Sequence, residues 1–116
     1  MTMRELTLQE KILVANFASR LDVKMRQRLL YDLNHAVVKT EESDGARVVF
    51  EIQGYLRPPY IGQHSYGVEG QMLDDDDGNL SVLLFADQDD RLLELELLRW
   101  DGEVIRRPRW DTLKLF

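Results

Sequence analysis

The chain has 116 residues, of which 44% are hydrophobic and 31% charged, a composition typical of one soluble globular domain. It contains no cysteine, which excludes a disulfide framework, a zinc-thiolate site and a thiol nucleophile. No apolar run approaches the roughly 20 residues that cross a bilayer, and the first residues lack the apolar core of a signal peptide. We therefore expect a single cytoplasmic domain over residues 1–116, without membrane contact.

The net charge of −6 is unevenly distributed along the chain. Residues 1–58 hold nine basic and eight acidic side chains, whereas residues 59–116 hold six and thirteen, giving charges of +1 and −7. An acidic surface repels nucleic acid phosphates and speeds the encounter with a basic partner. The second half of the chain is therefore the place where we expect a basic protein to bind.

Two helices are expected at the N-terminus. Thr7 and Glu10 match the capping-box pattern and predict a helix that begins near Leu8. Its apolar residues recur every three or four positions and form one stripe: Leu13, Phe17 and Leu21. Asp22 is a second N-cap candidate and predicts another helix over residues 23–34. A single long helix dented at Asp22 is the alternative.

The pattern changes at residue 36 to β-branched residues and alternation. Residues 36–42 and 47–55 read as a hairpin, because Asp44 and Gly45 between them are typical of a tight turn. Two prolines then interrupt the alternation, and we expect residues 56–65 to form a loop that crosses an edge of the sheet.

The second half of the chain reads as a meander of strands. Alternation predicts strands within residues 66–73 and 92–100, and a run that is apolar on both faces predicts a central strand within 79–86. Short acidic turns join them, and the apolar tail is expected to dock. The predicted fold is α+β, with two N-terminal helices packed on a mostly antiparallel sheet of five or six strands.

Four consecutive aspartates, Asp74 to Asp77, precede Gly78 and raise the question of a calcium loop. With Gly78 at position 6 of such a loop, positions 1 and 12 fall on Leu73 and Leu84, which offer no oxygen ligand. The second acidic cluster would lie about 30 Å away, at the other end of an extended strand. We therefore expect solvent-facing turns, with Gly78 supplying the positive φ, and neither a metal nor a cofactor.

Other residue patterns were weighed as catalytic or nucleic-acid sites. Glu94 and Glu96 would share one face of a strand, as paired carboxylates do in glycosidases, but a half-exposed strand gives the same alternation. His64 lies in the long loop beside Ser65 and is the candidate base of an alternative small enzyme. A second alternative is weak nucleic-acid binding by a helical basic ridge formed by Arg20, Lys24 and Arg28.

Residues 66–105, YGVEGQMLDDDDGNLSVLLFADQDDRLLELELLRWDGEVI, resemble small uncharacterised bacterial proteins. Their shared pattern is Asp-x-Asp-Gly, a hydrophobic strand, Leu-x-Glu-Leu-Glu and a final Asp-Gly turn. In size, charge and style of fold the chain also resembles small acidic immunity proteins found beside bacterial toxins. That second resemblance implies a non-enzymatic binder of a basic nuclease, and it assigns no contact residue.

These patterns favour a non-enzymatic protein-binding protein over an enzyme. We expect no catalytic residues and a basic protein partner, as for an immunity protein that covers a toxin. A homodimer through a sheet edge or the helices is also compatible with the sequence. The predicted partner-binding residues come from the acidic turns and the tyrosine-rich loop: Asp74, Asp75, Asp89, Asp90, Tyr60, His64 and Tyr66.

Overall fold

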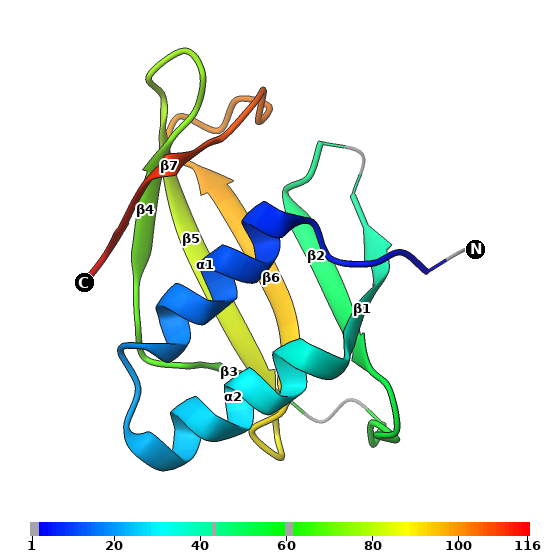
Figure 1. Cartoon of the computed structure of the whole chain (residues 1–116). Coiled ribbons are helices and arrows are strands. Elements are labelled where there is room, and N and C mark those ends of the chain that lie inside the picture. The colour runs from blue at the N-terminus through cyan, green and yellow to red at the C-terminus, as the bar shows by residue number, and fades with distance from the viewer. Residues whose placement is uncertain (1–2, 43, 60–61) are drawn as a thin grey trace.

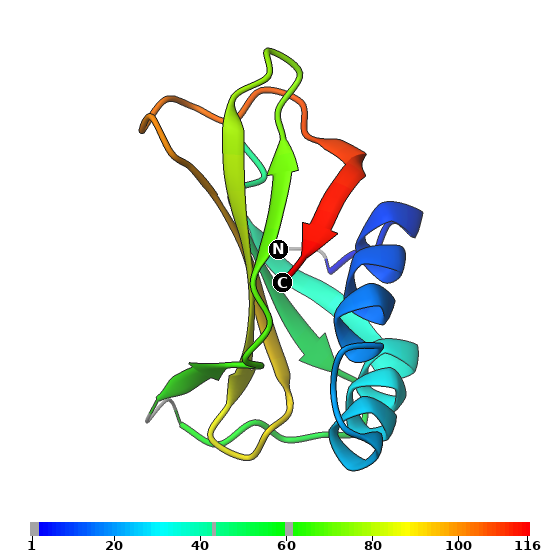
Figure 2. The same cartoon turned by 90° about the vertical axis from the view of Figure 1, so that its left-hand side faces the viewer.

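The protein folds as two layers, a pair of helices and a curved antiparallel sheet (Figures 1 and 2). The computed structural model describes residues 3–42, 44–59 and 62–116. The helices α1 (Leu8–Ala18) and α2 (Val23–His35) both cover the same face of the sheet. The predicted α+β class is confirmed.

In the part of the chain that the structure describes, the sheet contains seven strands, which is more than the five or six predicted. Their spatial order is β1-β2-β6-β5-β4-β7, and β3 pairs with one end of β5. The excess arises because three residues of the predicted loop pair as β3 and because the tail continues the sheet as β7. The strands are β1 (Ala36–Glu41), β2 (Arg47–Ile52), β3 (Gln63–Ser65), β4 (Gly70–Leu73), β5 (Asn79–Asp87), β6 (Leu92–Arg99) and β7 (Arg109–Leu115).

The capping residues fix the helix boundaries as predicted. The Thr7 hydroxyl accepts from the Glu10 amide at 3.1 Å, and the Glu10 carboxylate accepts from the Thr7 amide at 2.8 Å. Asp22 Oδ1 accepts from the Met25 amide at 2.9 Å, so the chain forms two helices and not one. Arg20 lies in the connection between them and donates to the Leu115 carbonyl at 3.0 Å.

Two acidic turns at opposite ends of β5 share one backbone geometry. In each turn, the backbone carbonyl of the first aspartate accepts a hydrogen bond from the amide three residues later. Asp74 accepts from Asp77 and Asp87 accepts from Asp90, both at 3.0 Å. The fourth residue of each turn has a left-handed backbone conformation, with φ 68° for Asp77 and φ 63° for Asp90. This is the arrangement of a three-residue hairpin loop, and aspartate tolerates the left-handed region better than most residues. The prediction that Gly78 supplies the positive φ was therefore wrong.

One hydrophobic cluster fills the space between the helices and the sheet. Alternate residues of the central strands point into it, and both helices contribute fully buried side chains, so that the cluster includes Phe17, Leu29, Phe50, Leu84 and Leu95. β5 is flanked by β4 and β6, which confirms its predicted central place. None of the helices in the described part of the chain is long and apolar enough to span a membrane.

Candidate functional site

The first residue of the aspartate run lies inside the protein. The Asp74 side chain has no exposed area, and its two carboxylate oxygens accept from the Arg106 and Arg107 amides at 2.8 and 2.7 Å. Arg99 Nη1 donates to Asp74 Oδ2 at 3.0 Å. Burial acts to raise the pKa of Asp74, but these hydrogen bonds outweigh it and the pKa is lowered. Asp74 therefore fastens the segment after β6 to the β4–β5 turn.

Arg99 joins three carboxylates at this end of the sheet. Its side chain is only 5% exposed, and it pairs with Asp74, with Asp76 at 2.8 Å and with Asp101 at 2.6 Å. The hydrogen bond from Arg99 lowers the pKa of Asp101 to about 2. A Cβ on Gly78 would lie 2.5 Å from the Arg99 guanidinium, so close approach explains this glycine.

The remaining aspartates of the run also have cationic partners. Arg106 pairs with Asp75 at 3.2 Å, and Arg109 pairs with Asp77. The run was expected to face solvent as a free acidic surface. It is instead largely compensated by arginines from β6, β7 and the segment between them, residues far away in the sequence.

The second acidic turn is built around Asp87, which is buried at 4% exposure. Its Oδ1 accepts from the Asp89 and Arg91 amides, and its Oδ2 accepts from Tyr55 Oη and Arg57 Nη1, both at 2.7 Å. Burial tends to raise the pKa of Asp87, yet the hydrogen bonds produce a net lowering. This aspartate ties the segment after β2 to the β5–β6 turn.

A buried carboxylate of α2 completes this network. Asp32 has no exposed area and accepts from Arg91 Nη2 at 2.7 Å and from the Leu92 amide at 3.0 Å. The Arg91 guanidinium lies 4.2 Å from the centre of the Tyr55 ring, within cation–π range. Burial, together with the Asp87 hydrogen bond, raises the pKa of Tyr55 to about 12. The network docks α2 against the turn and leaves the Asp87 and Asp32 oxygens occupied.

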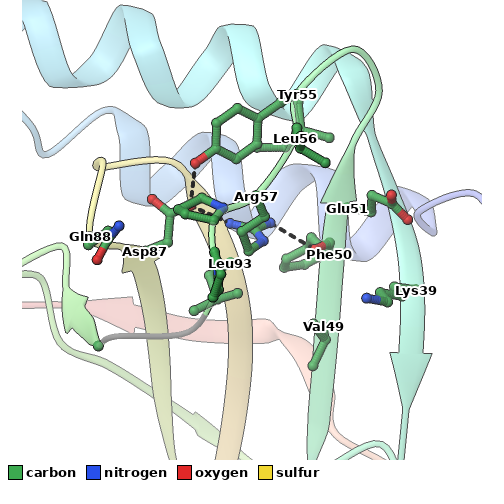
Figure 3. Close-up of a pocket in the computed structure, with 14 residues that line it drawn as sticks. Lys39, Val49, Phe50, Glu51, Tyr55, Leu56, Arg57, Asp87, Gln88 and Leu93 are labelled. Carbon is green, nitrogen blue, oxygen red and sulfur yellow. Dashed lines mark hydrogen bonds and ion pairs between the residues drawn. The ribbon is translucent and has the colours of Figure 1, made fainter.

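A pocket of about 350 Å³ lies beside this network (Figure 3). Figure 3 shows Tyr55 and Arg57 converging on Asp87, with Lys39 and Glu51 on the neighbouring strands. Arg57 is held by backbone as well, since its Nη2 donates to the Phe50 and Leu92 carbonyls at 3.0 and 2.9 Å. Asp87 and Arg57 therefore stabilise each other at the pocket wall, whereas Glu51 Oε2 is buried without a hydrogen-bond partner among the described residues.

Of the predicted partner-binding residues in the tyrosine-rich loop, the structure describes His64 and Tyr66. His64 lies on β3 and its Nε2 is 2.7 Å from Asp90, which also pairs with Arg28 at 3.8 Å. The Tyr66 hydroxyl is buried and has no hydrogen-bond partner among the described residues, and burial raises its pKa. Tyr60 lies outside the described residues.

The basic ridge does not form as predicted. It required one continuous helix, but the chain breaks at Asp22 and leaves Arg20 outside both helices. Lys24 and Arg28 lie on α2, and Arg28 is directed to Asp90. The proposed nucleic-acid site therefore loses the geometry on which it depended.

The face of the sheet opposite the helices, here called the open sheet face, carries the pair Glu94 and Glu96, for which the sequence favoured an ordinary half-exposed strand. Figure 2 shows that no helix covers this face and that β3 and the segment after β6 lean toward its side. Strand pairing places apolar and acidic residues together on its central strands β2, β5 and β6: Val49, Leu83, Phe85, Glu94, Glu96 and Leu98. The sequence signal for this face is the alternation of residues along β6, which places Glu94, Glu96 and Leu98 on one side of the strand.

The charges on the open sheet face are unequally matched. Glu94 is buried at 3% exposure and accepts from Arg47 Nε at 2.7 Å. Glu96 lies directly opposite Arg47 in the register, yet it makes no ion pair among the residues that the structure describes. Burial, together with the charge of Glu94, raises the pKa of Glu96.

Exposed apolar side chains continue this face beyond Glu96. Leu98 and Trp100 are 47% and 58% exposed, and Trp100 Nε1 donates to the Ser81 hydroxyl at 2.9 Å, which holds the indole over the end of β5. An exposed aromatic with a fixed orientation is typical of protein contact surfaces.

Fold and surface together define a two-layer α+β protein with one uncovered sheet face. The chain belongs to the family described as a domain of unknown function, DUF6984, whose model matches residues 3–108. This agrees with the resemblance to uncharacterised small proteins, whereas the likeness to immunity proteins stays a prediction. The match covers β1 to β6 and ends before β7. Neither the curated proteins nor the solved structures contain a significant match.

Proposed function

We propose that this chain is a non-enzymatic cytoplasmic protein that binds a basic protein partner through the open sheet face. The observation that carries the proposal is the combination of exposed Trp100 and Leu98 with the half-buried carboxylate of Glu96. Aromatic and aliphatic side chains dominate the centres of protein interfaces, where charges are scarce and matched. The partner then supplies apolar surface and at least one positive charge.

The acidic turns have a smaller part in this proposal than the sequence suggested. Asp75, Asp89 and Asp90 contribute negative potential at the two ends of β5, which accelerates association with a cation. Asp74 has a structural role and is not available to a partner, because its side chain has no exposed area. Changing Asp75 and Asp89 to asparagine is expected to slow association at low salt and to leave dissociation unchanged.

The finer form of the proposal is an immunity protein that covers a toxin. It is supported by the size of the chain and its net charge of −6. Toxin nucleases present basic surfaces to nucleic acid, and an acidic partner complements them.

A growth assay tests this function directly. The protein encoded beside this chain's gene is expressed in bacteria with the wild-type chain or with the double variant Leu98→Ser/Trp100→Ala. The proposal predicts that the neighbouring protein arrests growth, that the wild-type chain restores it and that the double variant does not. The matched control is Leu8→Ser/Val23→Ser, which removes two apolar side chains of the helix layer that are 69% and 61% exposed.

The control variant is expected to protect like the wild type, because those side chains lie away from the open sheet face. Full protection by the double variant, at equal protein level, would reject the open sheet face as the binding surface. A neighbouring protein that is harmless would reject the immunity form, and binding is then measured directly with purified proteins.

A further inference from the structure

Glu96, like Glu51 on β2, is a carboxylate of the open sheet face that makes no ion pair among the described residues; unlike Glu51, it lies on the central strand β6 beside exposed Leu98. In the pairing of β2 with β6, Arg47 is directly opposite Glu96 and Val49 is opposite Glu94. The Arg47 guanidinium nevertheless bonds to Glu94, two pairs further along the register and on the same face of the sheet. Arg47 thus pairs with only one of the two carboxylates, and Glu96 has no ion-pair partner in the described part of the chain.

Two strand neighbours of Glu96 on the open sheet face are apolar. Leu83 is its direct neighbour on β5, and Leu98 follows on the same face of β6. Glu96 is half-buried, so water reaches its carboxylate only in part. A charge in such a place is costly unless a cation with matching geometry approaches from solvent.

We propose that Glu96 is the receptor for an arginine side chain of the protein partner. This rests on the proposed function and names the chemistry of the group that the open sheet face recognises. A guanidinium can bond both carboxylate oxygens while its flat faces lie against Leu83 and Leu98. A lysine ammonium matches the charge but not the planar shape, so arginine is preferred.

Leu98 and Trp100 extend the proposed partner contact beyond Glu96. Glu96 and Leu98 lie about 7 Å apart along β6, and Trp100 follows in the turn directly after the strand. Trp100 is held by Ser81, the direct neighbour of Leu98 on β5. An arginine on Glu96 therefore places apolar partner residues over Leu98 and the indole.

The test is an NMR titration of the purified chain with acetyl-arginine-methylamide, with the neutral acetyl-citrulline-methylamide as the control probe. The expected result is a saturable shift of the Glu96 carboxyl carbon and of amides on β2, β5 and β6, about fivefold weaker in Glu96→Gln than in wild type. Glu5→Gln, which neutralises an exposed carboxylate near α1, is expected to bind like the wild type.

Three outcomes would overturn the proposal: equal shifts with the citrulline probe, unchanged binding in Glu96→Gln, or shifts centred on the acidic turns. The same variants separate this proposal from the proposed function. If Leu98→Ser/Trp100→Ala abolishes protection against the neighbouring protein and Glu96→Gln does not, the open sheet face is supported as the binding surface. The role of Glu96 as an arginine receptor is then rejected. If neither variant reduces protection, both proposals fall.

Discussion

Asp74 and Arg99 form an ion pair in the protein interior, with side chains that are 0% and 5% exposed and atoms 3.0 Å apart. The pair joins the β4–β5 turn to the end of β6, and the Asp74 carboxylate also binds two amides of the following segment. The aspartate run is therefore a structural centre, although its sequence resembles an exposed acidic loop.

Replacing Asp74 by alanine is expected to destabilise the protein by about 3 kcal/mol, because the backbone amides of Arg106 and Arg107 and the Arg99 guanidinium lose a fully buried acceptor. Urea unfolding followed by tryptophan fluorescence measures the change. The matched control is Asp75→Ala, whose side chain is 38% exposed, and a loss below about 0.5 kcal/mol is expected for it. Equal losses in the two variants would refute the structural role of Asp74.

The Gly78→Ala variant tests the close approach of the β4–β5 turn to Arg99. A Cβ at this position meets the guanidinium at 2.5 to 2.9 Å, and Arg99 cannot withdraw without releasing its carboxylates. We expect a lower melting temperature. Gly62→Ala is the control, because its Cβ meets no atom within 4 Å, and it should melt at or slightly above the wild-type temperature.

The buried aspartates are expected to make the protein sensitive to acid. The native pKa of Asp87 is below its unfolded value of 3.8, so its stabilisation is complete above that value and is lost as the pH falls through the native pKa. In Asp87→Asn, the free energy of unfolding should be lower at pH 7 and should change less between pH 5 and 2.5. Parallel curves for variant and wild type would contradict this assignment.

Glu96 is expected to behave in the opposite way. Its native pKa is raised above the unfolded value of 4.5, so its charge destabilises the fold at neutral pH, and this penalty disappears as the pH falls below 4.5. Glu96→Gln should therefore be more stable than wild type at pH 7, by about 0.5 kcal/mol, and equal to it near pH 3.5. Chemical unfolding at both pH values measures the difference, and a less stable variant at pH 7 would contradict it.

The local elements could be predicted because their signals lie within a few residues. Thr7 and Asp22 mark the helix starts, and Asp44 with Gly45 marks the first hairpin, where Gly45 has φ 75°. β3 was missed because three polar residues beside two prolines have no alternation to detect. It forms only because the end of β5 offers free backbone groups.

The candidate site depended on contacts between distant residues, and the sequence could not supply them. The sequence predicts an exposed acidic run because the arginine partners of these aspartates lie 23 to 33 positions away. The pair Glu94 and Glu96 was seen, but which of them Arg47 binds follows only from the register of β2 with β6. No sequence pattern near Asp32 predicts its burial, because its partner Arg91 lies 59 residues later.

The affinity of the purified chain for the protein encoded beside its gene, measured by calorimetry with matched variants, tests the central claim most directly. We predict that Leu98→Ser/Trp100→Ala weakens binding by about 100-fold or more, the loss of two interface-centre side chains, while Leu8→Ser/Val23→Ser leaves it unchanged. Unchanged affinity in the first variant together with a loss in the second would place the partner on the helix layer and contradict the account.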